Sequence, residues 1–564
     1  MKLYTKFLLT ILTSCSCLAA FAIPARLELR TVAQPDGSSI NIRVAGDEYL
    51  HFTITDDGYI LTLDADGFYR LASIDPEGMI VSTGILPDKK IAYGTKLSDI
   101  DTGAIKTLRE AAGKAPRMGV KSRAGAYPTS GSPRIPVFLV EYSDVKFSQD
   151  FDVKEYFTKM MTEDNFDMFG GTGSAAQYFR DQSDGKFTPQ FDIYGPVTLP
   201  ETQDYYGNNY GQGWDMKAHY MVSHAAKILD PDVDFSQYDA DKDGDVDFVY
   251  VFYAGQGEHN KGGENTVWPH AGNLKQVADF VFLDKVWFNR YACSNEMEGE
   301  MPNGLGPFVH EYSHILGLSD LYAEPEIVTD RDFTPGPYSV MDYGCYNNDS
   351  RTPPNYSAYE RNELGWNKPI RLEEPMNVTL NEISSGEFGM IPTTEYHEFY
   401  LLENRQQQGW DSALPAHGMV IWHVNRYLST GSTLNSDRDH QSVDLIEANG
   451  EPGFLQYAAD FTFPGTTGKT EFTSETVPAL LTSSGETIDM PITDITESED
   501  GVISFKVAGG VPEEPDDIET GIDSVSGENE APVYYDLQGL KIDNPRRGSI
   551  VIEKRGGKTA KIRF

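Results

Sequence analysis

The 564-residue sequence predicts a multidomain protein that combines an α/β domain with β-rich domains on either side of it. The chain is longer than one ordinary domain. Short strands separated by turns fill residues 23–110 and 369–510. Between these regions, apolar positions recur at helical spacing, as in residues 216–229. An apolar content of 39% is that of a globular protein with a sizeable core.

The first 22 residues are typical of a secretory signal peptide. Lys2 and Lys6 precede an apolar run, which small residues follow. We expect cleavage after Ala22, and the alternative is lipidation at Cys15, which ends a lipobox-like string. We therefore expect a secreted protein or one on the outer cell surface. No later segment is long and apolar enough to give the mature chain a transmembrane helix.

Residues 23–110 predict a small β-rich domain, because turn sequences such as Asp64-Ala65-Asp66-Gly67 separate its short apolar runs. We interpret it as a propeptide that masks the active site, and the alternative is a permanent accessory domain. Residues 111–134 are rich in Gly, Pro, Ser and basic residues, which predicts a flexible linker. Exposed basic linkers are good proteolytic sites, so we expect maturation there.

A strand at residues 135–142 opens the predicted catalytic domain, residues 135–368. Within it, His310 and His314 lie four residues apart, so on a helix they share a face and can hold one zinc. Gly317 can let the chain leave this helix in a left-handed conformation, which brings Asp320 round as a third ligand. Glu311 then points at a water on the metal.

This ligand set predicts hydrolytic chemistry. Two neutral imidazoles and a carboxylate leave zinc a coordination position for water and lower the pKa of that water towards about 7. Glu311 would take the proton during attack on a peptide carbonyl and pass it to the leaving amine. Downstream, Met341 lies in a string that resembles a Met-turn. Tyr343 can donate a hydrogen bond to the developing oxyanion, or it is an ordinary packed aromatic residue.

An acidic loop ahead of the strand at residues 248–253 predicts a calcium site. Alternating aspartates with Gly244 at the sixth position resemble the start of an EF-hand, but Tyr250 stands where an EF-hand has its bidentate glutamate. A different calcium loop is therefore expected, and the alternative is a solvated acidic turn. The candidate ligands are Asp239, Asp241, Asp243 and Asp247.

The chain has four cysteines, of which Cys15 and Cys17 lie in the signal peptide. Cys293 and Cys345 remain, and in an oxidising compartment they can form one disulfide. Because no cysteine lies between Ile23 and Cys293, a propeptide cysteine cannot be the ligand that blocks zinc.

After the catalytic domain, alternating strands predict a β-sandwich-like domain over residues 369–510. An acidic linker at residues 511–530 precedes a small C-terminal module, residues 531–564. Residues 541–564 hold eight Lys or Arg against two acids, although the whole chain has a net charge of −40. That overall charge argues against a nucleic-acid partner.

Several segments in one order resemble the secreted bacterial peptidases of the immune inhibitor A family, whose catalytic domain is a metzincin-like zincin. The resemblance runs from about Ile135 to Thr467 and includes the zinc motif, Met341, Trp268-Pro269-His270, Glu363-Leu364-Gly365-Trp366 and Asp460-Phe461-Thr462-Phe463-Pro464-Gly465. It implies that His310, His314 and Asp320 bind zinc, that Glu311 is the general base and that the aspartate loop binds calcium. It also implies a zymogen, secretion and broad protein substrates.

The C-terminal module is similar to type IX secretion sorting domains, on the strength of Tyr535-Asp536-Leu537-Gln538-Gly539 and a Lys-rich terminal strand. This similarity implies that the outer-membrane secretion machinery is a partner. Two other functions remain open. One is a catalytically silent surface binding protein, and the other is a metallopeptidase directed at mucins or glycoproteins.

Overall fold

The computed structural model describes residues 21–510 and 533–563, apart from residues 27, 49, 76–79, 89–93, 101–126, 210–214, 278, 323–334, 396, 429–433, 436–440, 452–454, 536–540, 543–544, 546–549 and 556–557. The chain divides into two compact units, residues 1–510 and 511–564. The expected signal peptide up to residue 20, most of the basic linker and the acidic linker lie outside the described residues. Among the helices that are described, none is both long and apolar enough to cross a bilayer.

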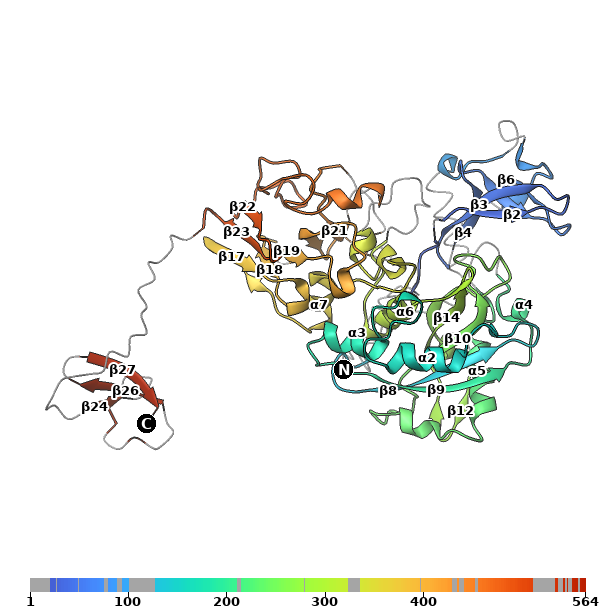
Figure 1. Ribbon diagram of the computed structural model, residues 1–564, viewed down its shortest axis with the longest axis horizontal. Coiled ribbons are helices and arrows are strands. Elements are labelled where there is room, and N and C mark those ends of the chain that lie inside the picture. Colours follow the sequence, from blue (N-terminus) through green and yellow to red (C-terminus); the bar gives the residue numbers. More distant parts are fainter. Residues whose placement is uncertain are drawn as a thin grey trace, which may run out of the picture. The chain divides into compact units, whose positions relative to one another are not determined.

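A seven-stranded sheet forms the centre of the first unit, in the order β1-β11-β14-β10-β8-β9, with β15 paired to β14 (Figure 1). Strands β14, β10, β8 and the edge strand β9 run parallel, whereas β11 is antiparallel to β14 and β1 is antiparallel to β11. Parallel strands read as continuous apolar runs because helices cover both faces. The strands are β1 (Phe21–Ala22), β8 (Arg134–Glu141), β9 (Gln190–Thr198), β10 (Val249–Gln256), β11 (His270–Asn273), β14 (Arg290–Glu298) and β15 (Met301–Pro302).

The two faces of this sheet carry separate hydrophobic clusters. Val137 and Leu139 of β8 point into one cluster with α2, α3 and α6, whereas Phe138 and Val140 point into the other with α5. Helix α6, which carries His310 and His314, therefore lies on one defined face of the sheet. Helix α5 lies on the other face and begins four residues after the predicted position. The helices are α2 (Val153–Thr162), α3 (Ala175–Gln182), α4 (Gln203–Tyr206), α5 (Tyr220–Leu229), α6 (Gly306–Leu316) and α7 (Ala358–Leu364).

The predicted flexible linker is shorter than expected at its C-terminal end, because residues 127–134 pack on the catalytic domain. Tyr127 is buried, and its hydroxyl accepts a hydrogen bond from the Tyr312 hydroxyl of α6 at 3.0 Å. The Trp366 indole donates to the Thr129 carbonyl at 2.7 Å. Burial of the large Tyr127 side chain stabilises an ordered conformation here, although the surrounding composition predicts a flexible linker.

The N-terminal region forms a six-stranded antiparallel sheet in sequence order, with a small core of its own. A short segment, residues 21–26, precedes this sheet and lies against the central sheet (Figure 1). The strands are β2 (Arg30–Ala33), β3 (Ser39–Gly46), β4 (His51–Thr55), β5 (Ile60–Leu63), β6 (Tyr69–Ile74) and β7 (Ile80–Ser82), followed by the 3₁₀ turn η2 (Leu97–Asp99).

Two sheets follow the catalytic region, in the orders β16-β18-β19-β20-β21 and β17-β23-β22. Side chains from both sheets, such as Leu402 and Phe505, share one hydrophobic cluster. The strands are β16 (Ile370–Arg371), β17 (Met376–Leu380), β18 (Gly389–Pro392), β19 (Glu398–Arg405), β20 (Gly418–Asn425), β21 (Val443–Leu445), β22 (Ile492–Glu497) and β23 (Ile503–Val507).

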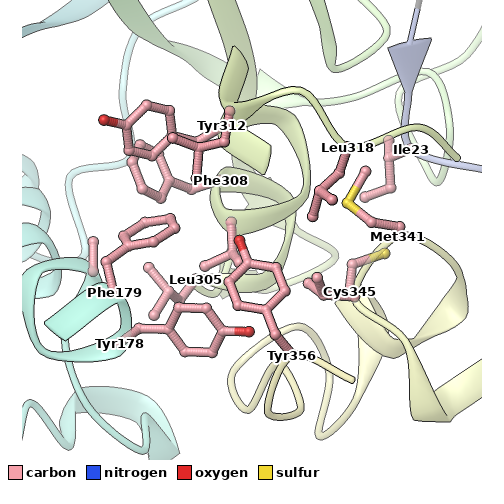
Figure 2. Packing of buried hydrophobic residues seen from close by; sticks show 14 of the residues in the cluster. Ile23, Tyr178, Phe179, Leu305, Phe308, Tyr312, Leu318, Met341, Cys345 and Tyr356 are labelled. Carbon is pink, nitrogen blue, oxygen red and sulfur yellow. The ribbon is translucent and has the colours of Figure 1, made fainter. Parts of the chain in front are cut away.

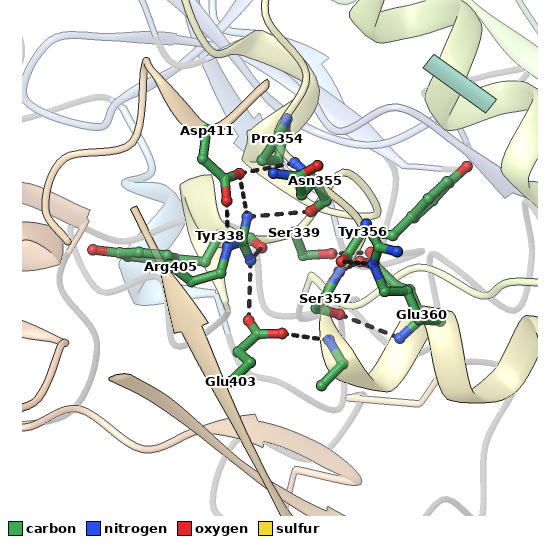
Figure 3. Close-up of polar contacts among 12 residues, drawn as sticks. Tyr338, Ser339, Pro354, Asn355, Tyr356, Ser357, Glu360, Glu403, Arg405 and Asp411 are labelled. Atoms are coloured by element: carbon green, nitrogen blue, oxygen red, sulfur yellow. Dashed lines mark hydrogen bonds and ion pairs between the residues drawn. The ribbon is translucent and has the colours of Figure 1, made fainter. Parts of the chain in front are cut away.

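A fully buried arginine, Arg405 of β19, joins these sheets to the catalytic region (Figure 3). Its guanidinium pairs with Asp411 at 2.6 Å and with Glu403 at 3.0 Å. It also donates to the backbone carbonyls of Tyr338 at 3.0 Å and Asn355 at 3.1 Å. Because Tyr338 precedes the Met341 turn, the C-terminal sheets support the floor of the candidate active site.

The remaining elements are short. Strands β12 (Phe282–Leu283) and β13 (Val286–Trp287) form a hairpin. The second unit contains a four-stranded antiparallel sheet of β24 (Val533–Tyr535), β25 (Lys541–Ile542), β26 (Ile550–Arg555) and β27 (Lys558–Arg563). The other 3₁₀ turns are η3 (Met168–Gly170), η4 (Phe235–Tyr238), η5 (Leu274–Val277), η6 (Gly336–Tyr338), η7 (Tyr343–Tyr346), η8 (Ile383–Ser385), η9 (Gly409–Asp411) and η10 (Leu455–Asp460).

Candidate metal centre and active site

Helix α6 and its C-terminal turn bring His310, His314 and Asp320 together. All three side chains are fully buried. The helix ends at Gly317, which has a φ of 106°, a left-handed conformation that glycine adopts without the strain of a side chain. Its turn redirects the chain, so that an Asp320 oxygen lies 3.2 Å from Nε2 of His310 and 3.3 Å from Nε2 of His314.

The orientation of both imidazoles suits a metal ion. Nδ1 of His310 donates to the Val340 carbonyl at 2.8 Å, and Nδ1 of His314 donates to the Leu318 carbonyl at 3.0 Å. In a neutral ring the proton is then on Nδ1, which leaves an unprotonated lone pair on Nε2. The two Nε2 atoms lie 3.1 Å apart and face the Asp320 carboxylate, whose oxygens accept no hydrogen bond from the described residues.

This donor set fits a divalent metal. A tetrahedral zinc needs donor atoms about 3.3 Å apart, since its bonds to nitrogen and oxygen are about 2.0–2.1 Å. The three donor atoms lie 3.1–3.3 Å from one another. Without a cation, two lone pairs and a carboxylate would face one another in a buried site, which is strongly unfavourable. His310, His314 and Asp320 are therefore able to hold zinc.

Glu311 lies on α6 beside these residues and is also fully buried. Burial raises the pKa of its carboxyl group to about 8, with His310 acting in the opposite direction. Its Oε1 accepts the backbone N–H of Ile23 at 2.9 Å, whereas Oε2 has no hydrogen-bond partner among the described residues. The glutamate that the motif predicts as a base thus already contacts a peptide nitrogen.

Met341 is fully buried and packs in one cluster with Ile23, Leu318 and Cys345 (Figure 2). The Met341 carbonyl accepts the backbone N–H of Leu321 at 2.9 Å, which ties the Met341 turn to the loop that carries Asp320. These contacts bury the Met341 side chain and join its turn to the Asp320 loop, and its role as a floor beneath a metal stays a prediction.

Tyr343 begins η7 and is half-buried. Its ring centroid lies 6.4 Å from that of Tyr346, and its backbone N–H donates to Asp342. Its proposed bond to an oxyanion remains a prediction.

An extended segment of the same chain covers this site. Ala22 of β1 pairs with His270 of β11, so the segment extends the central sheet by one strand. Beyond it, the Ile23 carbonyl accepts the Trp268 indole N–H at 2.9 Å, and the Pro24 carbonyl accepts the Tyr346 hydroxyl. Catalytic-domain side chains thus bind this segment through its backbone, as they would bind a peptide.

The aspartate loop gathers three of its four predicted ligands. Oxygens of Asp239, Asp241 and Asp247 lie within 4.8 Å of one another, in a group that is half-buried to exposed. Asp243 is not part of this group, and its side chain accepts the backbone N–H of Asp245 at 2.9 Å. Burial raises the pKa of Asp247 to about 6, and the neighbouring aspartates add to the shift.

The predicted disulfide is wrong: Cys293 and Cys345 are both free and buried. Cys293 of β14 points into the cluster on the α5 face of the sheet, where its thiol lies 3.5 Å from Nδ1 of His270. Cys345 belongs to the cluster on the α6 face, with Met341. The sheet separates the two thiols, and a count of cysteines contains no information about this separation.

Comparison with known proteins shows which class of protein this region resembles. Residues 137–367 match the family described as immune inhibitor A peptidase M6, catalytic domain. The comparison therefore supports a peptidase of this metallopeptidase family, and the matched residues include the whole donor set.

A particular relative agrees with this assignment. The chain is 29% identical over 252 residues to "Immune inhibitor A" of Bacillus thuringiensis subsp. alesti. That match covers 37% of this chain and 36% of the relative, so the chain spans about a third of the relative's length.

Several residues of the site were not assigned a role from sequence. Trp268 precedes β11, Tyr346 ends η7, and Ile23 belongs to the N-terminal segment. These residues lie close together only because the fold brings the three parts of the chain together. Trp268 lies in a string that the family resemblance includes, and this was the only sequence feature that could have pointed to a role for one of these residues. Backbone recognition of an extended segment leaves no pattern of residue types in the sequence.

Proposed function

We propose that this protein is a secreted zinc-dependent endopeptidase that hydrolyses peptide bonds in extracellular proteins. The observation that carries the proposal is the buried donor set of His310, His314 and Asp320, with the Glu311 carboxylate bonded to a peptide nitrogen. The family match over residues 137–367 supports the same class of reaction.

Zinc bound by the three side chains would supply Lewis acidity towards the scissile carbonyl and lower the pKa of a water. Glu311 accepts the proton of the attacking water and then donates it to the leaving nitrogen. The contact between Glu311 and the Ile23 nitrogen supports this second role, because it joins the two atoms that would exchange the proton. Tyr343 is assigned the donor role towards the oxyanion.

The N-terminal region, residues 23–110, is proposed to be a propeptide. Its first residues lie on the catalytic groups, and Ile23 is completely buried there. A second contact comes from the β-sheet itself, where His51 of β4 pairs with buried Glu258 at 3.1 Å. A substrate cannot reach Glu311 while this segment is bound, so proteolytic removal of the region is expected to activate the enzyme.

Two further proposals, on calcium and on export, come from the sequence analysis. Calcium is proposed to bind Asp239, Asp241 and Asp247, with no assigned role for Asp243. The leader and the C-terminal sheet are proposed to direct export to the cell surface or the medium through the outer-membrane secretion machinery.

Hydrolysis of casein by the processed protein tests the main proposal. Activity should be abolished by Glu311→Ala while the zinc content stays at one equivalent, because Glu311 is a base and not a ligand. Glu300→Ala is the matched control, since Glu300 is an exposed glutamate of the same domain. If the processed wild-type protein cleaves neither casein nor mucin, the proposed function is wrong and a binding role is supported.

A further inference from the structure

Arg26 is an arginine whose side chain is only 9% exposed, and the catalytic domain provides most of its surroundings. One guanidinium nitrogen contacts Glu298 of β14, and the other lies 2.7 Å from Asp349. The Tyr346 ring lies beneath it at 5.4 Å. The remaining partner is Glu28 of its own segment, at 3.0 Å, and that residue is 53% exposed.

The carboxylate of Glu298 is held in place independently of Arg26. The Ser350 hydroxyl donates to its Oε2 at 2.9 Å, and the Asn260 amide donates to its Oε1 at 3.1 Å. Glu298 is itself 8% exposed. Without Arg26, Glu298 has only neutral hydrogen-bond donors among the described residues, so this buried carboxylate favours a cationic side chain. Asp349 adds a second carboxylate at the rim of this acidic pocket, where its side chain is 68% exposed and lies 3.9 Å from Arg351.

The position of Arg26 relative to the catalytic groups can be read from the segment. In peptide hydrolysis the general acid protonates the leaving nitrogen, and the nitrogen that contacts Glu311 is that of Ile23. The Ile23 nitrogen therefore occupies the place of the leaving nitrogen, and Ile23 corresponds to the first residue after the cleavage point. Arg26 then corresponds to the fourth residue after the cleavage point.

The backbone contacts support a substrate-like register. Strand β1 is antiparallel to β11, which shows the pairing and direction that a substrate chain can adopt along β11. Further along, the Arg26 backbone N–H donates to the His259 carbonyl at 2.9 Å. The segment is thus bound by the catalytic domain from the cleavage point to Arg26.

We propose that the acidic pocket of Glu298, Asp349 and Tyr346 is a substrate subsite that selects arginine at the fourth position after the scissile bond. This inference rests on the proposed peptidase function. Arginine fits better than lysine because two separate carboxylates meet its two terminal nitrogens while the aromatic ring stacks beneath its plane. In the full-length chain Arg26 occupies the subsite, and removal of the N-terminal region opens it to substrate.

The test uses the processed enzyme and a library of peptides cut from a whole proteome. Mass-spectrometric mapping of the products should show arginine enriched at the fourth position of the new N-termini. This measurement needs no variant, so it does not depend on how a substitution at a buried site affects folding. If the enzyme cuts the library with no enrichment there, the subsite is wrong while the proposed function stands.

Paired peptides then assign the effect to the residues. Two fluorogenic peptides that differ only in Arg or Leu at this position should differ about tenfold or more in kcat/KM, because the Leu peptide leaves Glu298 without its charged partner. Glu298→Gln and Asp349→Asn should each reduce the ratio towards one, mainly by slowing the Arg peptide. Glu300→Gln, an exposed neighbour, should leave the ratio unchanged. If neither variant changes the ratio of kcat/KM between the two peptides, the assignment of the subsite to these residues is wrong. If the wild-type enzyme cleaves neither peptide, the peptidase function itself is contradicted.

Discussion

Two groups of side chains in the catalytic region are placed to gather around a cation, and they differ in burial and in how their donor atoms are used. In the first, His310, His314 and Asp320 are fully buried and their lone pairs face one another. In the second, backbone N–H groups already occupy oxygens of Asp239, Asp241 and Asp247, and water reaches much of the loop. The Asp320 oxygens of the first group have no hydrogen-bond partner among the described residues, whereas in the second group Oδ1 of Asp239 is the buried oxygen without one.

The largest effect that tests this difference is expected from Asp320→Asn. Replacing the carboxylate by a neutral amide removes the only negative ligand, so zinc content and casein hydrolysis should fall together, by about 100-fold or more in rate. The measurement is metal analysis alongside initial rates on the processed protein. Asp241→Asn is the matched change in the exposed group and should keep zinc and most of the activity. An Asp320→Asn protein with a full zinc complement would show that Asp320 is not a ligand.

The contrast between the two groups also explains what could be predicted from sequence. The grouping of His310, His314 and Asp320 could be predicted because two of these residues lie on one helix and the third follows a glycine that can turn the chain. All of this geometry is local. The Met341 floor was predicted for a related reason, since it accompanies that motif in the family that the chain resembles.

The acidic pocket around Arg26 could not be predicted, because its residues are separated by hundreds of positions and only the fold unites them. Arg26 meets Glu298 and Asp349 across 272 and 323 residues. In the sequence each is one charged residue among many. The same limitation made the disulfide prediction fail, because which face of β14 a cysteine occupies is set by pairing with other strands.

In a further group of charged side chains, which is fully buried, the positive charge is that of Arg405. The substitution Arg405→Met tests how much this group contributes to stability. The substitution would leave Asp411 and Glu403 without their partner, so unfolding free energy should fall by about 3–5 kcal/mol in urea titrations. The matched control is Arg371→Met, because Arg371 is exposed and its ion pair among the described residues is with exposed Glu373. It should cost no more than about 1 kcal/mol. Similar losses in both variants would contradict the distinction between buried and exposed charges.

Calcium titration of the thermal midpoint tests the aspartate loop itself. If the loop binds calcium, a concentration of about 100 times Kd should stabilise the wild-type protein by about 2.7 kcal/mol. Asp239→Asn combined with Asp241→Asn should remove most of this gain, because both side chains belong to the three-aspartate group. Asp232→Asn, an exposed change nearby, should leave it intact. A midpoint that does not respond to calcium would identify the loop as a solvated turn.

The smallest effect is expected from reduction of the protein. Cys293 and Cys345 lie in clusters on opposite faces of the central sheet, so no bridge constrains the turn that carries Met341. A reductant should therefore leave the thermal midpoint of the zinc-loaded protein unchanged. Alkylation after unfolding should label both thiols without prior reduction, with Cys293→Ser as the control for one site. A linked peptide containing both cysteines would show that covalent constraint, rather than the packing of α6 and the cation, holds the buried donor set in place.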